Sequence, residues 1–409
     1  MDDFSIVSRI VRERGPLCPY CLGSLVGTLL KEFPNYVKGL SLSFILDRLV
    51  SSGKGACIIC SDTISENIEY LLEKALNKLE NIEYYSIKAG VILPPDIIEK
   101  EDRIRASYNP PNMESVKVTL IKWLDLLLSA KTGRHVSKEA DVEVIFDFSL
   151  KDALIKVAPV FVYGRYRKLE RGISQSRRIC QHCNGQGCEK CNWTGKIAEG
   201  SVEGMIGEVI KEAFVSEDYV LHAAGREDVD ARMLGMGRPF VMEIISPKKR
   251  RLDLEEISKR INDRWKGKIE VIGLRYSNRK EVAKIKEGSP FVRKLYRALV
   301  EVEGDISEDE LEKLESSLRG IIKQRTPQRV AWRRADIVRT KKVYDVKTMR
   351  IGKNIFEMRV LCDGGLYVKE LISGDDGRTT PSVSEILGKK SFCRELDVLE
   401  VLDNSQQVM

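Results

Sequence analysis

Hydrophobic and polar positions follow two different periods in the first part of the chain. From Thr63 onward, apolar residues recur at the spacing of one helix face, and Thr63 with Glu66 has the pattern of a capping box. Beyond Ala140, apolar residues at every second position predict a strand. We expect a short helix after this strand. The helical stripe consists of Ile64, Ile68, Leu71, Leu72, Ala75, Leu76 and Leu79, and the alternating positions are Val142, Val144, Phe146 and Phe148.

The second part of the chain combines the same two patterns. Residues 202–214 predict a helix, and the apolar run "FVMEII" at 240–245 predicts a core strand directly behind a charged stretch. Ser307 and Glu310 form a second capping box. The helical stripe that follows it consists of Leu311, Leu314, Leu318 and Ile321. Both parts of the chain therefore combine helices with strands.

The length of 409 residues exceeds the size at which one hydrophobic core normally divides, so two or three domains are expected. The net charge of +7 is too small to indicate nucleic-acid binding by itself, so the distribution of charge has to decide. The N-terminus lacks a signal-peptide pattern, and no apolar run approaches the ~18 residues of a transmembrane helix. We therefore expect a soluble cytoplasmic protein without a membrane partner.

Eight of the ten cysteines fall in four Cys-x-x-Cys pairs, which indicates metal binding because the cytosol keeps thiols reduced. The last two pairs enclose a loop with Gly185 and Gly187, which supply the backbone freedom for a tight turn. Four thiolates suit a structural zinc ion with no open position, and buried reduced cysteine is the alternative. The predicted ligands are Cys18, Cys21, Cys57 and Cys60 in one site, and Cys180, Cys183, Cys188 and Cys191 in the other.

Three segments concentrate positive charge. Residues 165–178 hold six basic residues and one acid, residues 323–342 hold eight and one, and residues 248–251 add a short third run. Aromatic residues lie in or beside these segments, as Tyr166 and Trp332 illustrate. A single charge run is usually only a solvated face. Lys and Arg neutralise phosphates, and aromatic rings stack on unpaired bases. The three basic segments together therefore favour a long folded RNA as the binding partner.

The charged stretch ahead of "FVMEII" carries a resemblance to a known family. Gly225-Arg226-Glu227-Asp228 resembles the G-R-x-D signature of pseudouridine synthases. The longer string "AGREDVDARMLGMGRPFVMEI" resembles the archaeal-type tRNA pseudouridine synthases that act on uridines 54 and 55 of the T-arm. The segments "QRTPQRVAWRRADIVRTKKVY" and "GGLYVKEL" resemble further motifs of that branch, and the N-terminal part resembles its THUMP-type RNA-binding region. The likeness extends over nearly the whole chain.

The resemblance implies an isomerase that converts T-arm uridine 54 and/or 55 to pseudouridine, with tRNA as partner and without a catalytic cofactor or small-molecule cosubstrate. Asp228 would be the essential carboxylate, which either attacks C1′ or removes the C2′ proton, and Lys369 would be its cationic partner. Tyr344 would stack on the target base, and Arg226 would fill the gap that a flipped nucleotide leaves. Further expected RNA contacts are Tyr367, Leu396, Arg325, Arg329, Arg333, Arg334, Arg165 and Arg167.

The resemblance also implies an α+β fold. Residues 166–409 are expected to form a pseudouridine synthase domain with a mixed, largely antiparallel sheet and a central cleft, and with a zinc hairpin inserted at about 180–191. Residues 1–165 are expected to form an α/β zinc and THUMP-like module that docks the tRNA body. Leu366, Val368 and Trp332 depart from the family pattern, but none of these changes removes a charged catalytic group.

Three other functions are compatible with parts of the sequence. A THUMP-containing methyltransferase or thiouridine synthase would need a Gly-rich cofactor loop or a pyrophosphate loop, and the "GMG" at 235–237 lacks the spacing. A non-enzymatic RNA-binding zinc protein would explain the cysteines and the basic segments but not the G-R-E-D string. A DNA-binding zinc-ribbon factor would be expected to show a helix–turn–helix pattern, which we do not find.

Overall fold

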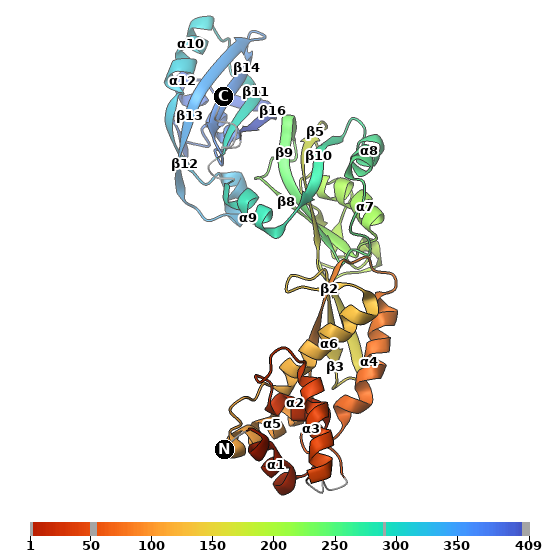
Figure 1. Cartoon of the computed structure of the whole chain (residues 1–409). Helices are drawn as coiled ribbons and strands as arrows, with labels where there is room; N and C mark the ends of the chain where they lie inside the picture. Colours follow the sequence, from red (N-terminus) through yellow and green to blue (C-terminus); the bar gives the residue numbers. More distant parts are fainter. Residues whose placement is uncertain (1–2, 50–54, 289–291, 403–409) are drawn as a thin grey trace. The chain divides into compact units, whose positions relative to one another are not determined.

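The structure is a computed structural model that describes residues 3–49, 55–288 and 292–402. The chain forms two compact units, of which the first comprises Met1–Pro159 with Ser246–Arg250 and the second comprises Val160–Ile245 with Arg251–Met409. Each unit has its own sheet with helices packed on it (Figure 1), so the predicted α+β class is confirmed. The expected domain division after residue 165 falls inside strand β5 (Val160–Lys168), all of which belongs to the second unit.

The first unit is built on a four-stranded sheet with the order β2-β1-β3-β4. β1 runs parallel to β2 and β3, while β3 and β4 form an antiparallel hairpin. Helices α4 and α6 pack against this sheet through buried leucines (Figure 1). The strands are β1 (Ser86–Ile92), β2 (His135–Val136), β3 (Val142–Asp147) and β4 (Asp152–Val157), and the helices are α1 (Asp3–Arg14), α2 (Pro19–Leu25), α3 (Asn35–Leu49), α4 (Thr63–Leu79), α5 (Pro95–Tyr108) and α6 (Val116–Thr132).

Two local predictions for the first unit are wrong for physical reasons. Thr63 does not cap α4, because the N-cap residue is Asp62 in a left-handed conformation (φ 61°) and its side chain caps nothing. The expected short helix after β3 is a tight turn into β4, closed by the Asp147 carboxylate, which accepts hydrogen bonds from the Ser149 and Leu150 amides. The helical stripe of α4 and the alternation of β3 are confirmed, since both follow from side-chain burial.

The second unit contains a ten-stranded sheet with the order β10-β5-β9-β16-β11-β14-β13-β12-β15, and β8 pairs with β9 outside this path. Among its described strands, only β9 and β16 pair in parallel, so the sheet is mixed and largely antiparallel as predicted. The strands are β5 (Val160–Lys168), β8 (Asp218–Ala223), β9 (Ala231–Ile245), β10 (Ile269–Ser277), β11 (Arg293–Val302), β12 (Gly320–Arg325), β13 (Val338–Arg350), β14 (Ile355–Asp363), β15 (Thr379–Thr380) and β16 (Ser391–Leu402).

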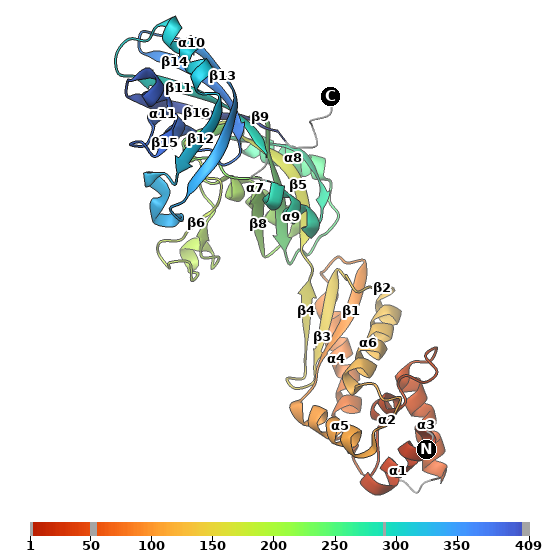
Figure 2. The same ribbon diagram turned by 90° about the vertical axis from the view of Figure 1, so that its left-hand side faces the viewer.

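Helices cover both halves of the large sheet. α7 and α8 pack together on the half that carries β8 to β10, and α10, α11 and α12 pack on the half that carries β13 and β16 (Figures 1 and 2). A small hairpin of β6 and β7 with the η1 turn projects from the unit (Figure 2). These elements are α7 (Val202–Phe214), α8 (Leu254–Arg264), α9 (Arg279–Gly288), α10 (Glu308–Ser317), α11 (Val368–Ser373), α12 (Val383–Leu387), β6 (Arg178–Ile179), β7 (Lys196–Ile197), η1 (Glu189–Cys191) and η2 (Gln328–Arg333).

The capping box of α10 is confirmed in full. The Ser307 hydroxyl accepts from the Glu310 amide at 3.2 Å, and the Glu310 carboxylate accepts from the Ser307 amide at 2.9 Å. The stripe behind it is shorter than predicted, because Gly320 turns the chain at φ 125° and Ile321 lies in β12 with its side chain exposed.

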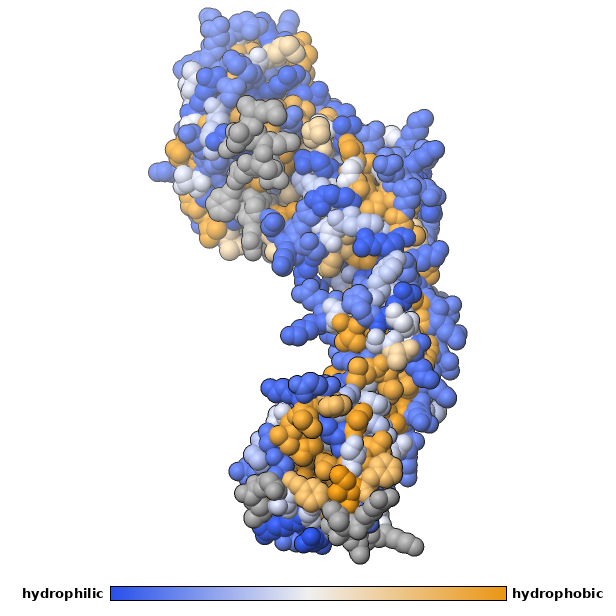
Figure 3. All heavy atoms as spheres, viewed as in Figure 1, coloured by the Kyte–Doolittle hydropathy of each residue, from blue (hydrophilic) through white to orange (hydrophobic). Residues whose placement is uncertain are grey.

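The first unit also has an apolar cavity of about 420 Å³, bordered by Phe4, Leu30, Phe33 and Ile45 among others. Leu30 and Phe33 are more than half exposed, and Figure 3 shows a hydrophobic area at the end of the unit that carries α1 to α3. The residues that line this cavity are mostly apolar. Among the described residues, no helix combines the length and the apolar character that crossing a membrane requires.

Gly207 tests the packing of α7 on β8. An alanine Cβ there would lie 2.1 Å from two ring atoms of Tyr219, which is fully buried. Alanine gains ~1 kcal/mol over glycine inside a helix, but a clash with a fixed ring outweighs this gain. We expect Gly207→Ala to lower the free energy of unfolding by ~2 kcal/mol in thermal denaturation.

Gly352→Ala is the matched control, because the nearest atom to its Cβ lies 3.9 Å away. Its unfolding temperature should match that of the wild type. Equal unfolding temperatures for the two variants would show that Tyr219 yields easily and that this contact does not fix α7.

Candidate active site

A cavity of about 380 Å³ lies at the middle of the large sheet, where β9 meets β16. Its walls come from the loop before β9, from β11, β13 and β16, from η2, and from the segment that leads into α11. The lining residues are Gly225, Arg226, Glu227, Asp228, Ala231, Lys294, Tyr296, Arg329, Arg334, Arg339, Lys341, Gly364, Gly365, Leu366, Tyr367, Val368, Lys369, Leu396 and Val398. Segments far apart in the sequence thus converge on one pocket of the second unit.

Asp228 lies on the loop that joins β8 to β9. Gly225 allows the loop to leave β8 with a φ of 78°. From behind, the amine of the fully buried Lys168 donates to the backbone oxygens of Asp228 at 2.9 Å, Val229 at 3.1 Å and Ile173 at 2.8 Å. Burial lowers the pKa of Lys168 to about 8. The amine thereby fixes the backbone of the loop and leaves the Asp228 carboxylate on the cavity side.

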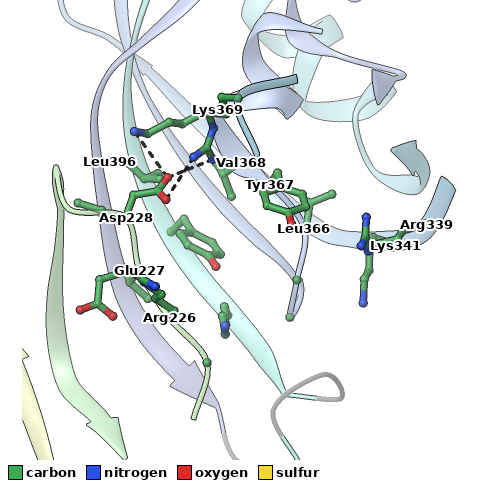
Figure 4. A pocket seen from close by; sticks show the side chains of 18 of the residues that line it. Arg226, Glu227, Asp228, Arg339, Lys341, Leu366, Tyr367, Val368, Lys369 and Leu396 are labelled. Atoms are coloured by element: carbon green, nitrogen blue, oxygen red, sulfur yellow. Dashed lines mark hydrogen bonds and ion pairs between the residues drawn. The ribbon is translucent and has the colours of Figure 1, made fainter. Parts of the chain in front are cut away.

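Glu227 faces away from the cavity opening, into the protein. Its carboxylate accepts from the Arg238 guanidinium at 2.7 Å and from the Tyr166 hydroxyl at 2.9 Å, and the side chains of all three are buried. Gln175 completes the network through the Tyr166 hydroxyl and the Gly225 carbonyl oxygen. Because a buried charge needs a partner, this pair neutralises Glu227 and locks its neighbour Asp228 in place. Figure 4 shows the two carboxylates pointing in different directions.

Two cations lie beside the Asp228 carboxylate. Arg329 lies 3.1 Å from Oδ2, and Lys369 lies 3.6 Å from the same atom. Figure 4 shows Lys369 next to Asp228. Burial disfavours the guanidinium charge, but Glu370 and Asp228 more than offset it, so the pKa of Arg329 lies above its usual value. Lys369 contacts Asp230 more closely, at 2.7 Å. Arg329, which the sequence placed only among the RNA contacts, is therefore the nearer cation, and Lys369 is shared between two aspartates.

The strand pair that frames the cavity is held by Asp397. This carboxylate is fully buried and pairs with Arg232 at 2.8 Å, Arg171 at 2.8 Å and Arg297 at 2.7 Å. Burial acts to raise the pKa of Asp397, but the three arginines outweigh it and hold the pKa below its usual value. Because Arg232 lies on β9 and Asp397 on β16, the cluster joins the two halves of the sheet beside Leu396 and Ala231.

The structure places Tyr344, the tyrosine expected to stack on the target base, outside the lining of this cavity. Its hydroxyl donates to Asp363 at 2.8 Å, and the Arg293 guanidinium lies 4.1 Å from its ring centre. Tyr296 on β11 lines the cavity instead and is 8% exposed. Burial raises the pKa of Tyr296, so its hydroxyl remains protonated.

The predicted RNA contacts divide into two groups. Arg226, Arg329, Arg334, Tyr367 and Leu396 line the cavity together with Asp228 and Lys369. The other predicted arginines lie elsewhere: Arg165 binds the Met236 and Gly237 carbonyl oxygens, Arg167 binds the Gly235 carbonyl oxygen and Glu270, and Arg325 pairs with Asp336. The side chain of Arg333 lies outside the described residues.

Four basic or aromatic residues of the cavity were not predicted from the sequence. Arg339 and Lys341 belong to the basic segment 323–342, but nothing in that run distinguished them from their neighbours. Lys294 and Tyr296 occupy the buried phase of β11, whose positions alternate strictly between buried and half-buried. A lysine in phase with buried apolar residues of a strand was the signal that could have found them.

The two four-cysteine groups are assembled as the spacing predicted. All four sulfur atoms of each group lie within 4.8 Å of one another. Tetrahedral sites with metal–sulfur distances of ~2.3 Å have sulfurs ~3.8 Å apart. The Sγ–Sγ distance is 3.5 Å between Cys18 and Cys60 and 3.7 Å between Cys188 and Cys191. The Gly187 amide also donates to the Cys183 sulfur at 3.2 Å, as it would to a thiolate. Both groups can hold a metal ion.

Comparison with known proteins agrees with this geometry. Residues 161–402 match the family model described as "Pus10, C-terminal". A protein of Korarchaeum cryptofilum named tRNA pseudouridine synthase Pus10 is 60% identical over 362 residues, which cover 88% of this chain and 97% of that protein.

This chain belongs to the Pus10 family. Proteins of the same name from Methanocaldococcus jannaschii and Pyrococcus furiosus are each 39% identical, over 98% and 97% of this chain and 96% and 97% of their own lengths. Membership in the Pus10 family sets aside the methyltransferase, thiouridine synthase and DNA-binding alternatives.

Solved structures resemble the chain more weakly. A Cbf5-Nop10-Gar1 complex matches with 19% identity and a TM-score of 0.30, over 48% of this chain and 44% of that chain. A structure described as pseudouridylate synthase matches with 13% identity and a TM-score of 0.22, over 59% and 66%. At these scores neither similarity bears on the site.

Asp397 tests how much the cavity depends on the β9–β16 contact. Asp397→Asn would leave three arginines without their shared carboxylate, and breaking a buried pair costs ~3–5 kcal/mol. We expect urea denaturation to show a loss of this size at neutral pH. In the wild type the Asp397 carboxylate contributes its full stabilisation above pH 3.8, the ordinary pKa of an aspartate. This stabilisation is lost as the pH falls through the lower pKa that Asp397 has in the folded protein.

Asp336→Asn is the matched control. Asp336 also joins two arginines, Arg325 and Arg378, but it is exposed, so its removal should barely change the urea midpoint. A similar midpoint for both variants would contradict the importance of the buried cluster.

Proposed function

We propose that this chain is a tRNA pseudouridine synthase that isomerises uridine 54 and/or 55 of the T-arm in the cavity around Asp228. The observation that carries the proposal is one accessible carboxylate, 32% exposed, held between Arg329 and Lys369 in a cationic pocket. The same carboxylate lies in the string that resembles the catalytic signature of the family. The chain's curated relatives bear the name of this enzyme.

Asp228 is the residue that acts on the ribose. It either attacks C1′ or removes the C2′ proton, and both routes need an ionised carboxylate in a partly closed pocket. Arg329 and Lys369 lie 3.1 Å and 3.6 Å from this carboxylate and are placed to balance its negative charge. Lys168 and the Glu227–Arg238 pair hold the loop from behind, so Asp228 is positioned before the substrate enters.

The remaining cavity residues suit a flipped nucleotide. Tyr296 offers a ring beside the buried end of the pocket, and Leu396 and Val398 give an apolar wall for the uracil face. Tyr296 thus takes the base-stacking role that we first expected of Tyr344. Arg226 is exposed at the cavity without a hydrogen bond or ion pair to another described residue, so it is available to fill the gap in the RNA stack.

The T-arm substrate accounts for the remaining positive charge. Arg334, Arg339 and Lys341 line the cavity beyond Asp228 and are placed to neutralise RNA phosphates. We assign residues 1–165 to docking the tRNA body and residues 166–409 to catalysis, and we place the enzyme in the cytoplasm with its substrate. No cofactor takes part, because the reaction only relocates one bond of the base.

We also propose that each four-cysteine group holds a structural zinc ion. Four sulfur ligands leave no open position, so the metal would stabilise the fold and not act on the substrate. In the first unit the metal would tie the N-terminal end of α2 to the chain before α4, and in the second it would stabilise the small hairpin at about 180–191.

The test of the enzyme is chemical detection of pseudouridine in an unmodified tRNA transcript, by carbodiimide treatment and reverse-transcription stops. Wild type should give stops in the T-arm, at the uridine or uridines used. Asp228→Asn should lower the rate at least ~10⁴-fold. It should bind tRNA at least as tightly, because it removes a negative charge from a cationic cavity.

Asp230→Asn is the matched control, since Asp230 lies on the same loop and also contacts Lys369 but is 67% exposed. We expect it to retain activity within ~10-fold. If the wild type binds tRNA but forms no pseudouridine, the chain is an RNA-binding protein and not this enzyme. If only Asp230→Asn loses activity, the catalytic aspartate is Asp230 and not Asp228.

Metal analysis by mass spectrometry should find two zinc ions per chain. Cys57→Ser and Cys183→Ser should each lose one, because a three-sulfur site binds far more weakly. Cys393→Ser should keep both, since Cys393 belongs to neither group. Iron in place of zinc, or one ion in the wild type, would overturn the zinc assignment.

A further inference from the structure

Lys294 is a buried lysine in the cavity wall. It lies on β11, where buried and half-buried positions alternate, and it shares the buried face with Tyr296. Only 5% of its surface is exposed. Since it lines the cavity, that small exposed part faces the pocket. Nothing in the assigned roles of Asp228, Arg329 and Lys369 uses this amine.

Lys294 differs from other buried cations among the described residues. Arg238 is paired with Glu227, Lys168 donates to three carbonyl oxygens, and Lys38 donates to two. Within the described parts of the chain, no hydrogen bond or ion pair holds the Lys294 amine. An unpaired buried ammonium is costly, so a fold that keeps one beside an open pocket sacrifices stability there.

The cavity carries more positive charge than its carboxylates balance. Its lining includes seven Lys and Arg side chains, whereas its two carboxylates are Glu227, already neutralised by Arg238, and Asp228. Burial is the main cause that lowers the pKa of Lys294 to about 7, and Arg238 and Lys341 lower it further while Cys362 and Glu227 raise it. The pocket is therefore poised to gain from an anion next to Lys294.

We propose that Lys294 is a catalytic residue whose ammonium stabilises the negative charge that develops on the detached uracil. The inference rests on the proposed function. When the N1–C1′ bond breaks, its electron pair stays on the ring and spreads over N1, O2 and O4. The ammonium donates a hydrogen bond to one of the two carbonyl oxygens of the base until C5 bonds to C1′. The C5 proton then leaves to solvent and N1 takes one up, so the isomerisation balances.

The position of Lys294 favours the base over an RNA phosphate. It is the most buried cation of the cavity and has Tyr296 two residues away on the same face of β11. A phosphodiester is bulky and hydrated, and exposed cations such as Arg226 and Arg334 already lie at the pocket. A desolvated charge has most effect where charge appears only in the transition state.

Lys294→Met tests the proposal, because methionine keeps most of the side-chain volume and removes the charge. Under single-turnover conditions on the T-arm substrate, we expect the rate to fall about 100-fold, while the Kd for tRNA stays within about twofold. The unfolding temperature should rise, since the variant no longer buries an unpaired ammonium. Lys38→Met is the comparator for stability: its amine has two carbonyl partners, so its unfolding temperature should fall.

The pH profile gives an independent readout. The free wild-type enzyme should lose kcat/KM as the pH rises through about 7, where the pKa of Lys294 lies and its ammonium is lost. This inflection should be absent from Lys294→Met. A wild-type profile that is flat through this range would overturn the ammonium role.

The outcomes separate the two proposals. If the wild type forms no pseudouridine, the proposed function fails. If the wild type is active and Lys294→Met is equally active, only the role of Lys294 fails. A weaker Kd with a salt slope reduced by about one and an unchanged rate would make Lys294 a phosphate contact. A fall in the unfolding temperature of Lys294→Met would show that Lys294 has a structural role. A phosphate contact and a structural role would each overturn the proposal.

Discussion

The parallel contact between β9 and β16 is the constraint on which the rest of the second unit depends. The described strands of its large sheet otherwise pair antiparallel, so this seam joins two antiparallel halves. Few backbone pairs span it, from Ala231 with Leu396 to Met233 with Val398, and the buried Asp397 adds three arginines to it. The cavity lies at this contact, since Ala231, Leu396 and Val398 line it. Its shape thus depends on a buried ion cluster that is stable only while complete.

Buried charge also positions the reactive loop. Glu227 and Asp228 are adjacent in sequence, yet one is neutralised inside the protein and the other faces the cavity. The buried neighbour acts as an anchor, and Lys168 adds hydrogen bonds to the backbone. The charged stretch 225–240 therefore serves two purposes, since Glu227 and Arg238 hold the loop while Asp228 and Arg226 remain available at the cavity. The glycines in it allow the close turns that this arrangement needs.

The same physics gives the cavity its electrostatic character. Where the protein completes a buried pair, as in Glu227–Arg238, the result is rigidity. Where it leaves a cation unpaired, as at Lys294, the result is a site that gains from binding an anion. At Lys294 the proposed function costs stability, whereas at Asp397 the same ion cluster serves both stability and the shape of the cavity. A tRNA enzyme binds an anionic polymer and a transiently anionic base, so it can use both unpaired cations and completed ion pairs.

The sequence alone determined the features that depend on local spacing. The α10 capping box, the stripe of α4, the strand behind Asp228 and the four-cysteine group at 180–191 follow from near neighbours in the chain, whereas folding brings together the two Cys-x-x-Cys pairs of the first group. Even locally it failed where backbone conformation intervened, as with Asp62 ahead of Thr63. Only the tertiary structure decided that Arg329 is the nearer partner of Asp228, and that Tyr296, not Tyr344, lines the cavity. Tyr296 and Arg329 lie about 70 and 100 positions from Asp228 in the chain. Sheet register, which no local pattern encodes, brings such residues together.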